Sequence, residues 1–435
     1  MSRSGIGNLA VSFENETEHA YNRIGRRIVP FLLFCYVCSY LDRLNIGYAK
    51  LQMLGDLRMS ETAYGLGAGI FFIGYVIFEI PSNFVMMRVG ARFWIGRIMV
   101  TWGLISGAMA LVSSPMVFYV LRFLLGAAEA GFIPAALYYM STWLPDQRRG
   151  RATALFMIGI PLSGIIAGPV SGLILSKLNG VGGLAGWQWM FVIEAIPTVI
   201  GGLICFFFLD NTVGAVSWLS ESGRSAVAAD LAREAASRPL HSIRSGLLDP
   251  KVWALSGLYM FFTMGLYAVS FWLPSIIRSS GVKDVLTVGL LAAIPYAVAL
   301  PTMLLIGRSS DARRERRWHL AAPAFVGAIG LFFSVIYAKD TALAMVGLTV
   351  ATACILTTIP QFYTLPPAIL TGGAAAMGFA LANSAGSIAG FISPYLLGYV
   401  KDATGSTNIG VTVVGAGLLI GAALTFGFPR SLVNK

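Results

Sequence analysis

The sequence predicts an all-α membrane protein in which twelve transmembrane helices form two pseudo-symmetric six-helix bundles. Of its 435 residues, 56% are hydrophobic and only 12% are charged, whereas an ordinary soluble domain has about a quarter charged residues. The mean hydropathy is +0.74, and uncharged stretches of membrane-spanning length recur along the chain. So few charges cannot cover a large aqueous surface, and we therefore expect lipid to cover much of it.

The uncharged stretches locate the individual helices, because a membrane-spanning helix needs about 20 apolar residues. In the first half we place spans at 28–48, 62–87, 94–113, 117–140, 151–176 and 187–209. In the second half, the uncharged stretches 252–277, 285–307, 318–338 and 403–429 each predict one span. The stretch 341–400 is too long for one helix, and a break is predicted at Pro366, Pro367, Gly372 and Gly373.

Hydrophilic segments divide the chain around these spans. We expect a cytoplasmic tail at 1–27, one bundle at 28–209, a cytoplasmic linker at 210–250, a second bundle at 251–430 and a short tail at 431–435. The first 27 residues contain no apolar segment followed by a cleavage site, so no cleavable signal peptide is predicted. Arg88 and Arg308 follow equivalent spans about half a chain length apart, which indicates two repeated halves.

The distribution of lysine and arginine predicts the orientation. Alternate loops and tails carry 22 of these residues on one side of the predicted membrane. The other side carries seven, at Lys50, Arg58, Lys177, Arg278, Lys283, Lys339 and Lys401. Because cytoplasmic loops are enriched in positive charge, both termini are predicted to be cytoplasmic.

Several function classes are disfavoured by what the chain lacks. Its net charge of +11 is scattered over short loops, without the basic face and interleaved aromatic residues of a nucleic-acid-binding surface. The four cysteines (Cys35, Cys38, Cys205 and Cys354) all lie in apolar stretches, where they are expected to pack as small buried side chains. We expect no disulfide framework, metal site, cofactor or enzymatic activity.

The chemistry is expected at the charged residues inside the predicted spans, because such residues are costly in a membrane and usually functional. Asp42 and Arg43 lie in the first span, and Arg122 and Glu129 lie in the fourth. Arg122 and Glu129 are two helical turns apart and should face the same way, whereas Asp42 and Arg43 should diverge by about 100°. We expect Asp42 to pair with Arg122, which leaves Arg43 available to a central cavity.

This arrangement suits an anionic ligand, because two arginines can bind a carboxylate or phosphate through paired hydrogen bonds. Glu129 lies deeper in its span and is the better candidate for a proton carrier. The alternative is that the four residues form a structural ion-pair cluster between two helices. Glu79 and Glu194 are expected to have structural roles near the ends of their spans, in contact with interfacial groups or loop arginines.

The second half contains no charge in the middle of its spans. Its candidate cavity residues are therefore polar or aromatic: Tyr259, Thr263, Tyr267, Trp272, Tyr296, Asn383, Ser384 and Ser387. A cationic wall opposite a neutral hydrogen-bonding and aromatic wall fits a small anion with hydroxyl or ring substituents. The loop residues Arg88, Arg92, Arg308 and Asp311, with Arg313, are expected to form contacts between helices at the cytoplasmic end that are relevant to gating.

Four sequence runs resemble those of a known family. They are YLDR at 40–43, RVGAR at 88–92, GAAEAGFIP at 126–134 and NSAGSIAGFISP at 383–394. They resemble the major facilitator superfamily, and within it the bacterial anion:cation symporter branch, and the resemblance covers essentially the whole chain. The sequence departs from this pattern at Ser387, where relatives usually carry Asn, and in its first loop, which lacks an acidic residue of the general superfamily motif.

The resemblance implies import of a small organic carboxylate together with protons by alternating access, as in transporters of tartrate, galactonate, phthalate and hydroxyphenylacetate. Asp42 and Glu129 would couple protons, and Arg43 and Arg122 would bind the substrate carboxylate. The remaining implied site residues are Tyr40, Tyr75 and Asn383. An organic-anion antiporter remains an alternative, as does a transporter-like ligand receptor. We expect one chain in a bacterial inner membrane to suffice, with the proton as coupling ion.

Overall fold

The computed structural model describes residues 3–237, 249–370 and 373–434, all in helices or short connections. Part of the predicted linker (238–248) and Gly372 of the predicted break lie outside the described residues. The first half comprises α1 (Arg3–Asp56), α2 (Glu61–Val89), α3 (Ala91–Ala108), α4 (Pro115–Glu129), α5 (Phe132–Ser141), α6 (Asp146–Met157), α7 (Gly159–Lys177) and α8 (Gly186–Phe208). Helix α9 (Glu221–Ser237) lies in the linker.

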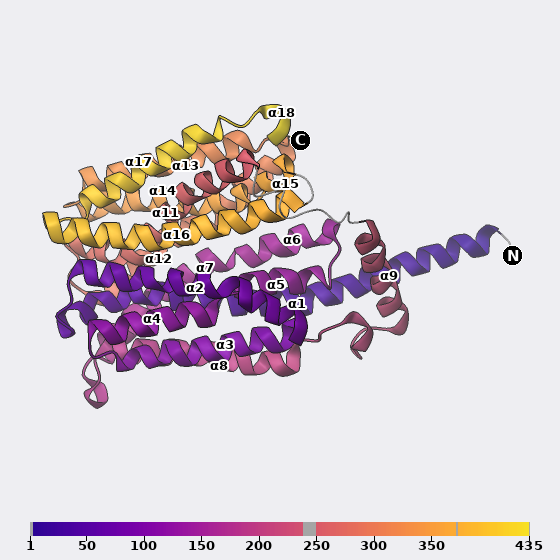
Figure 1. Ribbon diagram of the computed structural model, residues 1–435, viewed down its shortest axis with the longest axis horizontal. Coiled ribbons are helices and arrows are strands. Elements are labelled where there is room, and N and C mark those ends of the chain that lie inside the picture. The colour runs from indigo at the N-terminus through magenta and orange to yellow at the C-terminus, as the bar shows by residue number, and fades with distance from the viewer. Residues whose placement is uncertain (1–2, 238–248, 371–372, 435) are drawn as a thin grey trace.

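The second half comprises α11 (Pro250–Ser279), α12 (Val285–Arg313), α13 (Arg317–Ile336), α14 (Thr341–Phe362), α15 (Leu365–Ile369), α16 (Gly373–Thr404), α17 (Asn408–Thr425) and α18 (Arg430–Val433). Three short 3₁₀ turns, Met109–Leu111, Val181–Gly183 and Val213–Ala215, lie in the first half and linker. Figure 1 shows the two halves as neighbouring bundles of nearly parallel helices, with both ends of the chain at the same end of the molecule.

The helices confirm the membrane fold. Within the described residues, eleven helical segments are long and apolar enough to cross a membrane. Helix α16 is not among these eleven, but its 32 residues span about 48 Å at 1.5 Å per residue, which is long enough to cross a membrane. Large apolar side chains point outward from the bundles: Phe207 is 84% exposed, Ile80 79% and Leu111 77%. Such surfaces are stable facing lipid rather than water.

Several element boundaries differ from the sequence prediction, including the predicted fifth span, which is divided between α6 and α7 at Ile158. The first helix does not begin near residue 28, since α1 extends back to Arg3. Its polar first part contacts other polar elements, with Tyr21 donating a hydrogen bond to Asp230 of α9. The fourth span is also not continuous. It breaks between α4 and α5, where Gly131 has a φ of 90°, a left-handed conformation that glycine adopts without the steric cost of a Cβ atom.

Close contacts between glycines and backbone join the two halves. A Cβ atom at Gly398 of α16 would lie 2.3 Å from the carbonyl oxygen of Glu61 in α2. On the other side of the interface, a Cβ at Gly168 of α7 would lie 2.2 Å from the carbonyl oxygen of Gly289 in α12. Helices can approach this closely only where small residues face each other. The α2–α16 and α7–α12 pairs therefore hold the bundles together.

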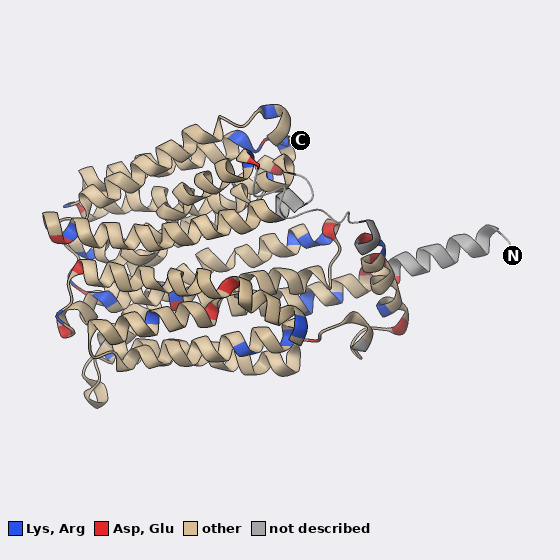
Figure 2. Cartoon of the chain, viewed as in Figure 1, with Lys and Arg blue, Asp and Glu red and all other residues tan. Residues whose placement is uncertain are grey.

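A group of charged and aromatic residues joins the halves at the end far from the termini. We call Lys50, Glu61, Trp272, Lys401 and Asp402 the distal cluster. The Nζ of Lys50 lies 2.6 Å from Oε2 of Glu61 and 3.2 Å from the ring centroid of Trp272. Lys401 forms an ion pair with Glu61, and Asp402 accepts the backbone N–H of Thr62 at 2.7 Å. Figure 2 shows most charged residues at the two ends of the helices and few between them.

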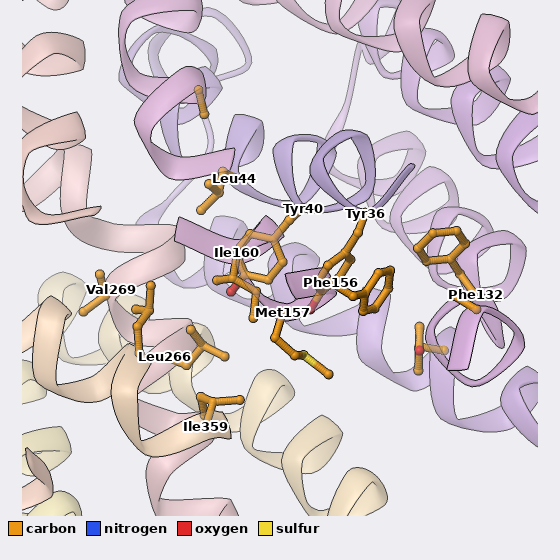
Figure 3. Close-up of a cluster of buried hydrophobic side chains, with 14 of the residues drawn as sticks. Tyr36, Tyr40, Leu44, Phe132, Phe156, Met157, Ile160, Leu266, Val269 and Ile359 are labelled. Carbon is orange, nitrogen blue, oxygen red and sulfur yellow. The ribbon is translucent and has the colours of Figure 1, made fainter. Parts of the chain in front are cut away.

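Apolar side chains from both halves fill the interface between the bundles. Tyr36 stacks on Phe156, with ring centroids 4.4 Å apart. In Figure 3, Tyr40 and Ile160 of the first half lie near Leu266 and Val269 of the second half. All of these side chains except Ile160 and Leu266 are less than 4% exposed, and those two are 5% and 4% exposed. This packing places the middle of α1 at the interface, which positions the charged residues of that helix.

Candidate functional site

The centre of the candidate site is a buried ion pair between α1 and α4. The Nη2 of Arg43 lies 2.7 Å from Oε1 of Glu129, and the Nε of Arg43 donates to the same oxygen at 2.9 Å. Ser39, one helical turn before Arg43, also donates to this oxygen at 2.7 Å. Arg43 is 7% exposed and Glu129 1%. Both charges are therefore held away from water. In this low-dielectric interior their mutual attraction is stronger than it would be in water.

The break after α4 determines where this carboxylate lies. Glu129 is the last residue of α4, and the chain then turns through Ala130 and Gly131 before α5 begins. Ser82 of α2 donates a hydrogen bond to the carbonyl oxygen of Ala130 at 2.6 Å, and a Cβ at Gly131 would lie 2.5 Å from the Ser82 hydroxyl. The glycine thus lets α2 approach the break and satisfy a free carbonyl.

Arg122 lies near this pair but is not part of it. Its Nε donates to the carbonyl oxygen of Gly67 at 3.2 Å, and its Nη2 donates to that of Ala68 at 3.0 Å. The ring of Phe71 lies between two arginines: its centroid is 4.9 Å from the guanidinium carbon of Arg122 and 5.3 Å from that of Arg43. The aromatic face favours both cations and keeps a region of positive charge on this side of the first bundle.

Asp42 points away from the arginines, toward α3 and α8. Its carboxylate accepts hydrogen bonds from Trp102 Nε1 at 2.7 Å, Ser106 Oγ at 2.9 Å and Thr198 Oγ1 at 3.0 Å. Asp42 is 2% exposed. Within the described residues, no lysine, arginine or histidine lies within ion-pair distance of it. Neutral donors, rather than a cation, therefore stabilise this carboxyl group.

The predicted pairing of Asp42 with Arg122 is wrong. Adjacent residues on α1 do diverge as expected, but the rotation of the helix aims Arg43 at α4 and Asp42 at α3 and α8. Arg43 is consequently bound to Glu129 and is not left free. Helix spacing gives the angle between two side chains on one helix, but only the packing of neighbouring helices decides which side chain meets which partner.

The three uncharged predicted residues lie along the interface between the halves. The hydroxyl of Tyr40 is 3.2 Å from that of Ser270 in α11. The ring centroid of Tyr75 lies 5.4 Å from the Arg43 guanidinium. Asn383 of α16 donates from Nδ2 to Oε1 of Glu79 in α2 at 2.6 Å. Tyr75 therefore lies against the Arg43 guanidinium, whereas Tyr40 and Asn383 form hydrogen bonds between the two halves. Glu79 contacts the second half rather than a loop arginine.

The polar and aromatic residues of the second half form their own group opposite. The hydroxyls of Tyr259 and Tyr363 are 3.0 Å apart. Tyr267 packs against Phe72 of α2, with ring centroids 4.4 Å apart, so it reaches across to the first half. Tyr296 instead packs against Gly164, and Trp272 belongs to the distal cluster. Only some of the predicted residues on this wall therefore face the ion pair.

The residues expected to influence gating lie at the terminal end of the bundles. Arg92 donates hydrogen bonds to the carbonyl oxygen of Phe206 at the end of α8. Arg88 and Arg308 are exposed, and the Arg88 guanidinium lies 4.4 Å from the ring centroid of Phe84. Asp311 accepts a hydrogen bond from Arg316 at 2.5 Å. Each of these contacts lies within one half of the molecule.

The distal cluster does not follow from the sequence pattern, which predicts a loop position for Lys50. Lys50 is 4% exposed and pairs with Glu61 at the start of α2. One signal was available in the sequence: Lys50 lies seven residues, or two helical turns, after Arg43. The two residues therefore share a face of α1, and that face is the one directed at neighbouring helices.

The arrangement contains the parts of a membrane transporter. Two helical bundles meet around buried charges of opposite sign in the middle of the spans, and one end of the interface is closed by the distal cluster. Intramembrane sites at the interface of repeated halves are how secondary transporters bind their substrates. Fold and site together define a multi-pass transport protein.

Comparison with known proteins agrees with this class. Residues 32–394 match the model of the Major Facilitator Superfamily, and the chain belongs to this superfamily. It is 48% identical, over 97% of both chains, to a protein of Pseudomonas putida described as the metabolite transport protein NicT. It is 43% identical, over 94% of this chain and 91% of the relative, to an Agrobacterium vitis protein described as a tartrate transporter.

Among solved structures, a bacterial homologue of the human lysosomal transporter Spinster in an inward-facing conformation has the same fold. Its TM-score is 0.75 with 17% sequence identity, over 94% of this chain and 97% of that chain. The predicted all-α fold and the family resemblance are therefore confirmed. The protein is a secondary transporter and not an enzyme.

Proposed function

We propose that the protein imports a small organic carboxylate together with protons by alternating access. The observation that carries this proposal is the buried Arg43–Glu129 ion pair at 2.7 Å. A carboxylate is already the partner of Arg43 in this structure. A substrate carboxylate can therefore bind Arg43 in the same position if Glu129 releases the Arg43 guanidinium.

Protonation of Glu129 supplies the exchange. A protonated Glu129 has lost its negative charge, so it no longer competes for the Arg43 guanidinium. A free guanidinium is then available to bind a carboxylate through paired hydrogen bonds. Binding of the proton and binding of the substrate thus favour each other by linkage. Loss of the proton restores the internal pair and displaces the substrate, which is the requirement for symport.

The surroundings of the pair support a small hydroxylated or aromatic anion. Arg122 adds positive charge beside Phe71, at 4.9 Å from its centroid. Tyr40, Tyr75 and Asn383 add hydroxyl and amide groups, and Tyr267 adds an aromatic wall. The relative described as a tartrate transporter fits the same chemical class. Tartrate is therefore the first probe to use, within a wider panel of sugar acids, hydroxy-dicarboxylates and aromatic acids.

Alternating access supplies the path across the membrane. The distal cluster closes one end of the interface, and the RVGAR segment at 88–92 and its equivalent near Arg308 lie at the other. We propose that opening requires the distal ion pairs to separate while the terminal ends of the bundles approach. The positive residues concentrated at the terminal end predict that this end is cytoplasmic, so the distal end would face the outside.

The proposal is tested with purified protein in liposomes. Thermal-shift measurements against the carboxylate panel identify a ligand, and Arg43→Ala should abolish the stabilisation that the ligand gives. Uptake of that ligand should rise when the outside is made acidic relative to the inside. Uptake that ignores an imposed pH gradient would contradict proton coupling, and uptake that instead requires an organic anion inside the liposomes would indicate an antiporter.

A further inference from the structure

A second buried carboxyl group, Glu194 on α8, lies in the first bundle away from the Arg43–Glu129 pair. It is 4% exposed, and its position in the sequence predicts contacts with interfacial groups or loop arginines. Its Oε1 instead accepts a hydrogen bond from Ser171 of α7 at 2.7 Å. Glu194 is thus buried where α8 contacts α7.

The groups around Glu194 include no compensating positive charge. Two titratable side chains of α1, Asp42 and Tyr48, interact electrostatically with Glu194. Neither can supply a positive charge. Within the described part of the chain, no basic side chain lies within ion-pair distance of Glu194. An ionised Glu194 would therefore be a second anion near Asp42 in a low-dielectric environment.

The amide of Asn45 lies between these two acids. Its Nδ2 donates to Oδ1 of Asp42 at 3.4 Å, and its side chain is also within hydrogen-bonding reach of Glu194. Asn45 is 1% exposed. Two buried atoms here have no hydrogen-bond partner, Oδ1 of Asn45 and Oε2 of Glu194. Both are acceptors, and buried polar atoms are rarely left unpaired.

We infer that Glu194 is a proton-binding site whose proton lies on Oε2 and is donated to Oδ1 of Asn45. A protonated carboxyl group has one O–H donor, so a single proton pairs both of the unpartnered atoms. This hydrogen bond also fixes the amide orientation, with Oδ1 toward Glu194 and Nδ2 toward Asp42. Glu194 thereby acts as a positioning residue for Asp42, through Asn45, and keeps a second negative charge away from it.

Infrared spectroscopy of the full-length protein in liposomes tests this inference without any substrate, so its outcome is separate from that of the symport proposal. A protonated carboxyl group has a carbonyl stretching band distinct from that of a carboxylate. At neutral pH the wild type should show a band from a buried protonated carboxyl, and Glu194→Gln should abolish it. Glu221→Gln, a matched change on the exposed start of α9, should leave it unchanged.

Two further variants keep the carboxyl group and test its environment. Ser171→Ala removes the donor to Oε1, and Asn45→Leu removes the acceptor of the proton, so each should shift the band. These variants also assign the band if Glu194→Gln fails to fold. Absence of the band in the wild type at neutral pH, or its full retention in a folded Glu194→Gln protein, would overturn the inference.

Discussion

Arg43 and Glu129 lie 86 residues apart in the sequence and form a buried ion pair with an N–O distance of 2.7 Å. The pair joins the middle of α1 to the last residue of α4. Both groups are almost fully buried, and in the proposed function the charge state of Glu129 decides whether Arg43 is occupied within the protein or available to a ligand.

Replacing Glu129 by glutamine should separate binding from accumulation. Glutamine resembles the protonated acid, so Arg43 is permanently released and a carboxylate ligand should still bind and exchange. No proton can be carried at this position, so accumulation driven by a pH gradient should fall to the background level. Counterflow and gradient-driven uptake in liposomes measure the two activities, with Glu221→Gln as the matched control. Full accumulation by the Glu129→Gln variant would remove Glu129 from the coupling mechanism.

Replacing Arg122 by lysine should destabilise the first bundle. The guanidinium donates to two carbonyl oxygens of α2 at 3.2 and 3.0 Å, and a compact ammonium group does not reproduce this fork. Losing a hydrogen bond from a charged donor costs about 1.5–3 kcal/mol. The apparent melting temperature in detergent should therefore fall although the positive charge is kept. An unchanged melting temperature would show that these two hydrogen bonds contribute little.

The distal cluster predicts a rescue experiment. Glu61→Gln leaves buried Lys50 without its carboxylate, and removing one partner of a buried ion pair costs about 3–5 kcal/mol. Replacing Lys50 by methionine as well removes the unpaired charge, so the double variant should recover much of the lost stability. Thermal unfolding of the single and double variants measures this. A double variant as unstable as Glu61→Gln alone would mean that Lys50 is not the source of the cost.

The contact between Gly398 and Glu61 predicts a steric effect at the distal end. An added Cβ would lie 2.3 Å from a backbone oxygen, and overpacking of this kind costs about 1–3 kcal/mol. Gly398→Ala should therefore weaken the closed distal interface and lower the melting temperature. Gly257→Ala on α11 is the matched control, because nothing lies within 4 Å of its added Cβ. Equal melting temperatures for the two variants would argue against close packing of α2 and α16.

A pH-dependent contribution is expected at Glu315, in the connection between α12 and α13. Partial burial raises the pKa of this carboxyl, but hydrogen bonds from Trp318, His319 and Asn434 outweigh it and hold the pKa below 4.5. A lowered folded-state pKa stabilises the protein above the unfolded-state value, and this stabilisation disappears as pH falls through the folded-state value. Glu315→Gln should therefore lower the melting temperature at neutral pH. The difference from wild type should vanish well below pH 4.5, and a pH-independent difference would contradict this account.

Much of the fold could be read from the sequence, because lipid imposes a simple constraint. Each span must be long and nearly free of charge, so stretches such as 285–307 could be assigned without knowledge of their neighbours. The break after Glu129 could not be assigned from the sequence. Gly131 is one of many glycines, and its left-handed conformation depends on the approach of Ser82. The extension of α1 back to Arg3 also escaped prediction, since it depends on contacts with α6 and α9.

The composition and the order of charges in the sequence by themselves determined a membrane fold of two halves. They also identified the charged residues inside the spans, which are costly in a membrane and usually functional: Asp42, Arg43, Arg122 and Glu129. Only the tertiary structure decided the partners. Arg43 meets Glu129, Asp42 meets Trp102, and Glu194 meets Ser171, because the rotation and packing of α1 against its neighbours set these distances. Periodicity along one helix contains no information about the rotation of the next, and electrostatic pairing depends on both.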